Sequence, residues 1–107
     1  MNAERDIAVV ALEGEIDLSA APEAERLIAE AEARGPAQLV VDLRAVTFMD
    51  SSGLRVLLTA HRRAEENGRT FALVRGGESV DRLLEVTGLV ERLVLLDEPP
   101  TNDRKPG

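Results

Sequence analysis

The chain has 107 residues, of which 44% are hydrophobic and 31% are charged, so its length and balance fit one folded domain. Its formal net charge of −7 argues against a direct nucleic-acid partner, which would need a basic face, and its only aromatic residues are Phe48 and Phe71. The lack of cysteine excludes thiolate chemistry, and with no signal peptide or long apolar run we expect a cytoplasmic chain without a membrane partner.

Predicted strands and helices alternate along the sequence. Apolar runs rich in β-branched residues predict strands, and apolar residues that recur at three and four positions predict helices. In chain order we expect a strand over Ile7–Leu12, a helix over Ser19–Arg34, a strand over Gln38–Leu43, a loop over Arg44–Asp50, a helix over Ser51–Glu66, a strand over Arg69–Val74, a helix over Ser79–Val86 and a strand over Leu93–Leu96.

This alternation implies crossover connections, so we expect an α/β fold with a small mixed, mostly parallel sheet and helices packed mainly on one side. Gly14 marks a bulge or turn at the end of the first strand, and Asp17 or Ser19 caps the first helix. Residues 1–97 should form one domain. The polar, proline-rich residues 98–107 should form a disordered tail.

The most informative segment is Asp50-Ser51-Ser52-Gly53, at the start of the second long helix. The plain interpretation is a helix cap, in which Asp50 or Ser51 accepts a hydrogen bond from a free N–H of the first turn. Two details favour a further role. Gly53 lies in the first turn, although glycine costs roughly 1 kcal/mol relative to alanine inside a helix, and it would let another molecule approach the backbone. The two hydroxyls lie where a helix start favours an anion, such as a phosphate on Ser51.

The sequence FMDSSGL, which follows an apolar strand ending in Asp-Leu, resembles the phosphorylation-site motif of STAS-domain anti-sigma factor antagonists. The resemblance covers residues 7–96. Within it, Leu12–Asp17 is similar to the first block of the family, and Val80–Leu89 is similar to its third helix and the following turn. The resemblance therefore implies a STAS-type single domain.

It also implies a function in bacterial transcription regulation by partner switching. The phospho-acceptor would be Ser51, and the partners would be an anti-sigma factor with serine kinase activity and a PP2C-type phosphatase. The chain itself would be neither an enzyme nor a cofactor-binding protein. The partner-binding residues that the resemblance implies are Asp17, Asp50, Ser51, Ser52, Gly53, Leu54 and Arg55.

Two features depart from the family pattern. Arg55 stands where some members have glycine, so partner contacts there would differ. The usual C-terminal helix is also missing, because the chain continues as DEPPTNDRKPG after the last predicted strand.

The main alternative function is a STAS domain that is never phosphorylated and acts as a structural or interaction module in a transport or signalling complex. An enzyme is a weaker alternative. His61, the only histidine, lies ten residues after Ser51, about 15 Å along an intact helix, so it is too far away to act as a base for that hydroxyl.

Other candidate sites are weaker still. Residues 75–78 (RGGE) lack the Gly-Lys-Ser/Thr ending of a phosphate-binding loop. Asp17, Asp42 and Asp50 match no compact metal-ligand spacing, and capping accounts for two of them. We therefore expect no metal site and no cofactor.

Overall fold

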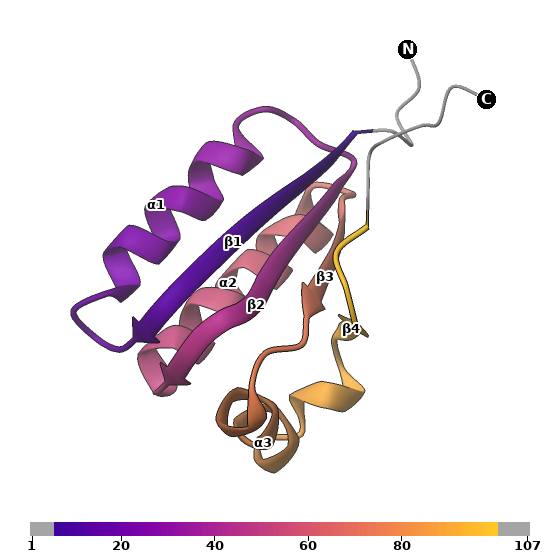
Figure 1. Ribbon diagram of the computed structural model, residues 1–107. Helices are drawn as coiled ribbons and strands as arrows, with labels where there is room; N and C mark the ends of the chain where they lie inside the picture. The colour runs from indigo at the N-terminus through magenta and orange to yellow at the C-terminus, as the bar shows by residue number, and fades with distance from the viewer. Residues whose placement is uncertain (1–5, 101–107) are drawn as a thin grey trace.

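A computed structural model describes residues 6–100 of the chain (Figure 1). Residues 1–5 and 101–107 lie outside the described residues, and the second range includes most of the predicted tail. The elements in chain order are β1 (Ile7–Ile16), α1 (Ala21–Glu32), β2 (Gln38–Met49), α2 (Ser51–Glu66), β3 (Thr70–Val74), α3 (Glu78–Val86), the 3₁₀ helix η2 (Leu89–Glu91) and β4 (Val94–Leu96).

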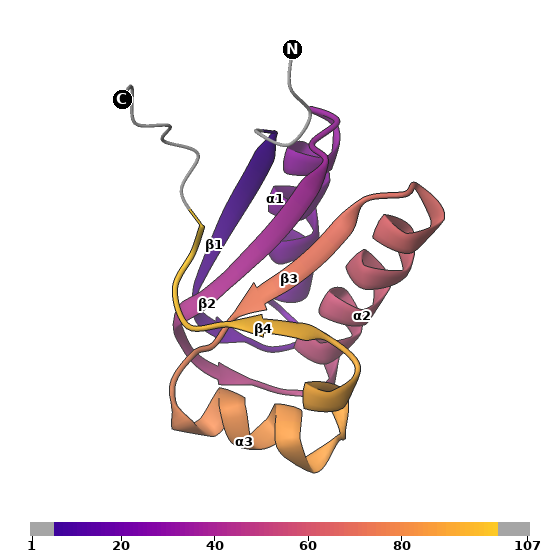
Figure 2. The ribbon, with the colours of Figure 1, turned by 90° about the vertical axis from the view of Figure 1, so that its right-hand side faces the viewer.

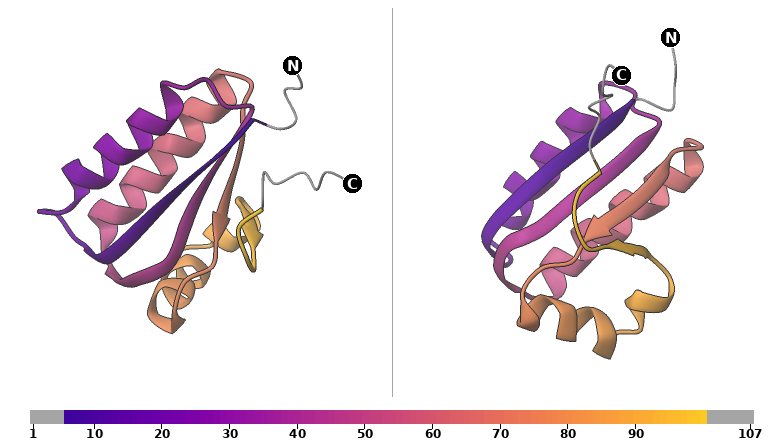
Figure 3. Two further views of the ribbon diagram at one scale, coloured as in Figure 1. Left: turned by 45° about the horizontal axis from the view of Figure 1, so that its top comes forward. Right: turned by 45° about the vertical axis from the view of Figure 1, so that its right-hand side comes forward.

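The four strands form one sheet in the order β1-β2-β3-β4, and each neighbouring pair runs parallel. Helices α1 and α2 lie side by side on one face of this sheet (Figure 3). Helix α3 lies across one end of the sheet rather than on that face (Figure 2). The predicted α/β architecture, with a mostly parallel sheet and helices mainly on one side, is confirmed.

The main core lies between the sheet and the two side-by-side helices, and its members are almost all aliphatic. The other face of the sheet has a small second cluster of Val40, Ala72 and Val74, on which Ile7 and Leu96 pack. The largest side chains with almost no exposure are Ile28, Leu39, Leu43, Leu57, Leu73 and Leu84 in the main core, together with valines of both clusters.

The prediction of a loop over Arg44–Asp50 is wrong, because β2 continues to Met49. The register with β1 shifts twice along this stretch, and each time β2 contains one more residue than β1. These bulges place the buried side chains Leu43, Val46 and Met49 three residues apart. The period of two that marks a strand in sequence is therefore lost.

The first strand is also longer than predicted, since β1 ends at Ile16 rather than at Leu12. Gly14 lies inside it, at one of the two register shifts, with a φ of 76° that favours glycine. The register shift at Gly14 agrees with the irregularity expected there, a bulge or turn, although the additional residue lies in β2. The expected end of the strand is wrong.

The helix over Ser51–Glu66 is confirmed at both ends. The first helix is shorter than predicted, because it spans Ala21–Glu32 instead of Ser19–Arg34. The remaining predicted strands and helix differ by one residue at their starts, and the 3₁₀ turn over Leu89–Glu91 was not predicted.

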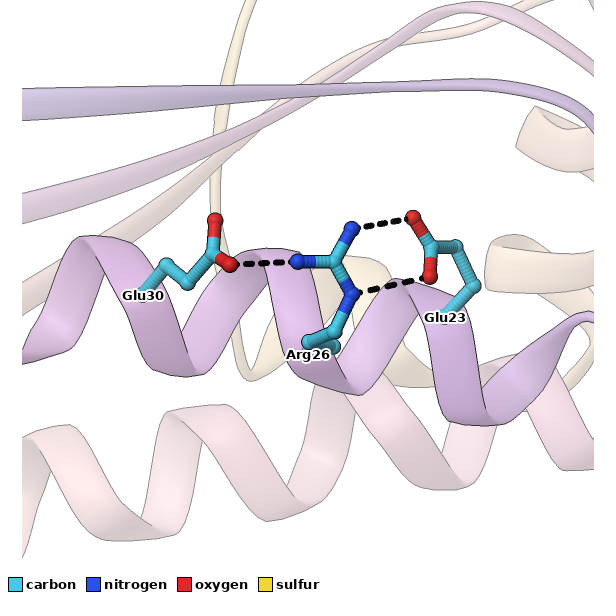
Figure 4. Close-up of polar contacts among 3 residues, drawn as sticks. All are labelled: Glu23, Arg26 and Glu30. Atoms are coloured by element: carbon cyan, nitrogen blue, oxygen red, sulfur yellow. Dashed lines mark hydrogen bonds and ion pairs between the residues drawn. The ribbon is translucent and has the colours of Figure 1, made fainter.

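Helix α1 carries a surface ion-pair cluster of Glu23, Arg26 and Glu30 (Figure 4). More than half of each side chain is exposed, so this cluster adds little to stability. A second pair ties α1 to α2, because Arg63 Nε lies 3.1 Å from Glu32 Oε2. Both residues lie near the C-terminal ends of their helices, so the two helices run in the same direction.

Asp42 on β2 is a buried charged residue, and Arg44 holds it. The Arg44 guanidinium donates to both carboxylate oxygens, at 3.0–3.3 Å, and the Arg44 backbone N–H donates to Oδ1. This pairing keeps the pKa of Asp42 below its usual value. The residue that was weighed as a metal ligand is thus engaged in an ion pair.

Two adjacent leucines of α2 give a test of the helix placement. Leu57 has no exposed surface, whereas Leu58 is half-buried at the margin of the core. Leu57→Ala should lower the free energy of unfolding by about 2–5 kcal/mol, measured by urea denaturation, because it leaves a cavity. Leu58→Ala, the matched control, should lower it clearly less. Equal losses would contradict the assigned orientation of α2.

Candidate partner-binding site

The candidate site lies where the carboxyl ends of β1 and β2 meet the start of α2. Ile16 and Met49, the last residues of the two strands, are register partners. The Asp50 N–H lies 3.4 Å from the Ile16 carbonyl oxygen, to which it donates. Since parallel strands end at the same edge of a sheet, the segments after β1 and β2 lie next to one another.

Asp50 is the N-cap of α2. Its Oδ1 accepts hydrogen bonds from the backbone N–H of Ser52, at 2.8 Å, and of Gly53, at 3.4 Å. The capping side chain turns inward to the first turn, while Ser51, the first residue of the helix, is exposed. Within residues 6–100, the Ser51 hydroxyl has no hydrogen-bond partner.

Asp17 also accepts hydrogen bonds from nearby backbone N–H groups, in the turn between β1 and α1. Its Oδ1 accepts hydrogen bonds from the Ser19 N–H, the Ser19 hydroxyl and the Ala20 N–H, at 2.9–3.1 Å. These donors, the Ser19 hydroxyl first, keep the pKa of Asp17 below its usual value. The carboxylate thus holds the turn that leads into α1. The predicted cap of this helix by Asp17 or Ser19 is wrong, because the N-cap residue is Ala20, which makes no side-chain cap hydrogen bond.

Gly53 is buried, and it packs against the protein's own strands. A Cβ at this position would lie 2.5 Å from Met49 Cγ and 2.8 Å from the Ile16 carbonyl oxygen. Real Cβ atoms do not come so close, so only glycine lets α2 start against the ends of β1 and β2. The close approach that the sequence suggested for a second molecule is therefore made inside the chain.

The other predicted site residues differ in their exposure to solvent. Leu54 is buried and belongs to the main core. Arg55 is exposed and Ser52 is half-buried, and both line a shallow groove between α2 and the start of α1. Ser51, Ser52 and Arg55 thus reach the surface at the start of α2, whereas Gly53 and Leu54 are buried beneath that surface.

Sequence reasoning missed Leu18, which lies between Asp17 and Ser19 and is 75% exposed. It lines the same groove, and the remaining lining residues are Ala21, Pro22, Glu25, Ser52, Arg55 and Val56. A large aliphatic side chain in an otherwise polar capping turn was the available signal. An exposed apolar side chain beside a groove is typical of a protein-binding surface.

His61 lies ten residues after Ser51 on the continuous helix α2, as predicted. Its ring packs on Phe71, with the centroids 5.7 Å apart, and Nε2 lies 3.4 Å from Glu65. It is therefore a partly buried residue away from the site. In the described part of the chain, no three His, Asp or Glu side chains are grouped as a metal ion would require.

Residues 1–101 match the sequence model of the STAS domain, so the chain belongs to this family. The anti-sigma-F factor antagonist RsfB of Mycobacterium tuberculosis is 36% identical over 83 residues, which are 78% of this chain and 67% of RsfB. Such relatives are regulatory proteins rather than enzymes.

Solved structures agree with this family. The crystal structure of an anti-sigma factor antagonist from Mycobacterium paratuberculosis superposes with a TM-score of 0.78 at 33% identity, over 87% of this chain and 79% of that one. The Bacillus cell fate determinant SpoIIAA in its phosphorylated form shares the fold, with a TM-score of 0.65 at 24% identity, over 88% of this chain and 86% of that one. Among the described helices, none is long and apolar enough to cross a membrane.

The tight contact at Gly53 can be tested directly. Gly53→Ala should lower the free energy of unfolding by about 1–3 kcal/mol, because its Cβ must displace Met49 or the Ile16 carbonyl. Ser52→Ala, one residue earlier, adds no atoms and should change stability by less than about 0.5 kcal/mol. Thermal and urea denaturation of both variants would check this, and a Gly53→Ala protein as stable as the parent would contradict the contact.

Proposed function

We propose that this chain is an anti-sigma factor antagonist that acts by partner switching and is regulated at Ser51. In its unmodified form it binds an anti-sigma factor with serine kinase activity, and the sigma factor is thereby released. Phosphorylation of Ser51 ends the binding, and a PP2C-type phosphatase restores it. The observation that carries the proposal is the exposed, unbonded Ser51 hydroxyl at the capped start of α2.

The surface around Ser51 supports a protein partner. Leu18 offers a large exposed apolar side chain, and the groove beside it contains Val56 as well as Arg55. Apolar anchors next to a few polar groups are what the centre of a protein interface needs. The antagonist names of the relatives favour an anti-sigma factor as the partner.

The chemistry required of Ser51 is simple. The kinase partner transfers the γ-phosphoryl group of ATP to the Ser51 oxygen, so that one O–P bond forms, the hydroxyl proton is lost and ADP leaves. A phosphatase reverses the result with water and releases inorganic phosphate. Asp50 already accepts hydrogen bonds from the N–H groups of Ser52 and Gly53, but the dipole of α2 still favours an anion near the helix start. The fold should therefore tolerate the phosphate.

The complex should tolerate it far less. Phosphate adds about −1.5 to −2 charges at neutral pH. A partner that packs over Ser51 and Leu18 would have to desolvate this charge, and Asp50 already supplies a carboxylate next to it. Burying an unpaired charge costs several kcal/mol even after relaxation. Since about 1.4 kcal/mol is a factor of ten, the affinity should fall by at least about a hundredfold.

We therefore expect that incubation with ATP and a cognate kinase-type anti-sigma factor labels the chain at one residue, Ser51, as located by mass spectrometry. Calorimetric titration should then show at least about a hundredfold weaker binding of the phosphorylated form. Ser51→Ala should abolish labelling and keep the affinity, because it removes only a hydroxyl. Ser51→Asp should bind poorly.

Ser52→Ala is the matched control for the labelled residue, and it should still be labelled at Ser51. Labelling at Ser52, or equal affinities of the modified and unmodified forms, would overturn the mechanism. Tight binding without any labelling would favour the alternative, a STAS interaction module that is never phosphorylated.

A further inference from the structure

Arg55 is a cation without an assigned partner beside the proposed phosphorylation site. It is exposed on α2, one helical turn after Ser51, and it lines the groove next to Leu18. Within residues 6–100, its guanidinium makes no hydrogen bond or ion pair, whereas Arg26, Arg44, Arg63 and Arg75 all pair with carboxylates. Arg55 is thus available to an anion.

The helix places Arg55 on the same face as Ser51. Residues four apart are neighbours on a helix surface, with their Cβ atoms about 5–6 Å apart. The Cα–Cβ bonds of a helix tilt toward its N-terminus, so the longer Arg55 side chain leans back toward the turn that contains Ser51. A guanidinium at the end of three methylenes can span this separation and meet a phosphate on the serine oxygen.

None of the acidic side chains near Arg55 pairs with it among the described residues, so Arg55 can bind a phosphate. Asp50 is occupied with the N–H groups of the first turn, and Asp17 is occupied with Ser19 and Ala20. Glu25 lies on the opposite wall of the groove but forms no ion pair with Arg55 among the described residues. Of the residues that line this groove, Arg55 is the only one with a positive charge.

We propose that Arg55 is a positioning residue for the regulatory phosphate: it pairs with phosphoserine at position 51 and holds the phosphate against the surface of α2. This inference rests on the proposed phosphorylation of Ser51. The planar fork of arginine can donate to two phosphate oxygens at once, and hydrogen bonds between charged groups are roughly twice as strong as neutral ones.

The pair would give the modification two effects on the partner surface. Phosphorylation adds negative charge at Ser51, and at the same time it removes a free cation, because Arg55 turns to the phosphate. Any carboxylate of the partner that contacts Arg55 in the complex would lose that contact. Family members with glycine at this position would show only the first effect.

The test uses the whole chain with phosphoserine placed at position 51 by genetic encoding, so no kinase is needed. A ³¹P NMR titration reads the second pKa of the phosphate, which is about 6 for an unperturbed phosphoserine. A cation favours the dianion, so Arg55 should lower this pKa, and Arg55→Gln should raise it by roughly 0.5 unit. Arg55→Lys should retain part of the effect, because it keeps the charge without the fork.

Arg62→Gln is the matched control. Arg62 is exposed on the same helix, without an ion pair in the described part, and lies roughly 16 Å from Ser51 along the axis. Its loss should leave the phosphate pKa unchanged. The same pKa in the parent and in Arg55→Gln would overturn the pairing. A shifted pKa in a chain that no kinase labels would support the pairing and contradict the proposed function instead.

Discussion

The candidate site depends on one close contact, in which the backbone of Gly53 lies against Ile16 and Met49. Without a side chain at Gly53, the first turn of α2 can rest directly on the paired ends of β1 and β2. The Asp50 N–H donates to the Ile16 carbonyl oxygen at the same junction, so the start of the helix is held by a hydrogen bond as well as by packing. With the Gly53 side of the helix start against the strands, Ser51 lies on the outer side of α2 and is exposed. The glycine of the motif is therefore part of the support of the phosphorylation site that we propose.

The residues at the start of α2 fall into two groups, a buried group that holds the helix in place and an exposed group that can contact a partner. Gly53 and Leu54 are buried and hold the helix, whereas Ser51 and Arg55 are exposed and can meet a partner. Two carboxylates complete the support, because Asp50 caps α2 and Asp17 holds the turn before α1, and each accepts hydrogen bonds from backbone N–H groups. Both carboxylates are therefore engaged within the chain. Substituting Asp50 or Asp17 should change the shape of the partner-binding surface rather than remove a direct contact with the partner. We therefore expect Leu18, Arg55 and the phosphorylation state of Ser51 to determine affinity. The buried residues and the two carboxylates should determine whether that surface forms.

The sequence predicted the parts of the fold that local signals specify. The helix over Ser51–Glu66 has Asp50 before it and Asn67-Gly68 after it, and both ends were found. The second half of β2 was missed because its bulges remove the alternation of buried and exposed residues. The role of Gly53 was misread because the sequence cannot show that Ile16, 37 positions earlier, faces it. Leu18 was missed for a similar reason: one apolar residue in a turn forms no pattern until the structure places it beside α2.

The central claim is that the partner binds the surface formed by the start of α2 and the turn before α1. Amide chemical-shift mapping of the ¹⁵N-labelled, unmodified chain with a cognate anti-sigma factor tests it most directly. The largest changes should fall on Leu18, Ser19, Ser51, Ser52 and Arg55. The amides of Val9 and Val94, which are exposed on the other face of the sheet, should stay unchanged. Large changes on that other face, with Ser51 and Leu18 unaffected, would contradict the account.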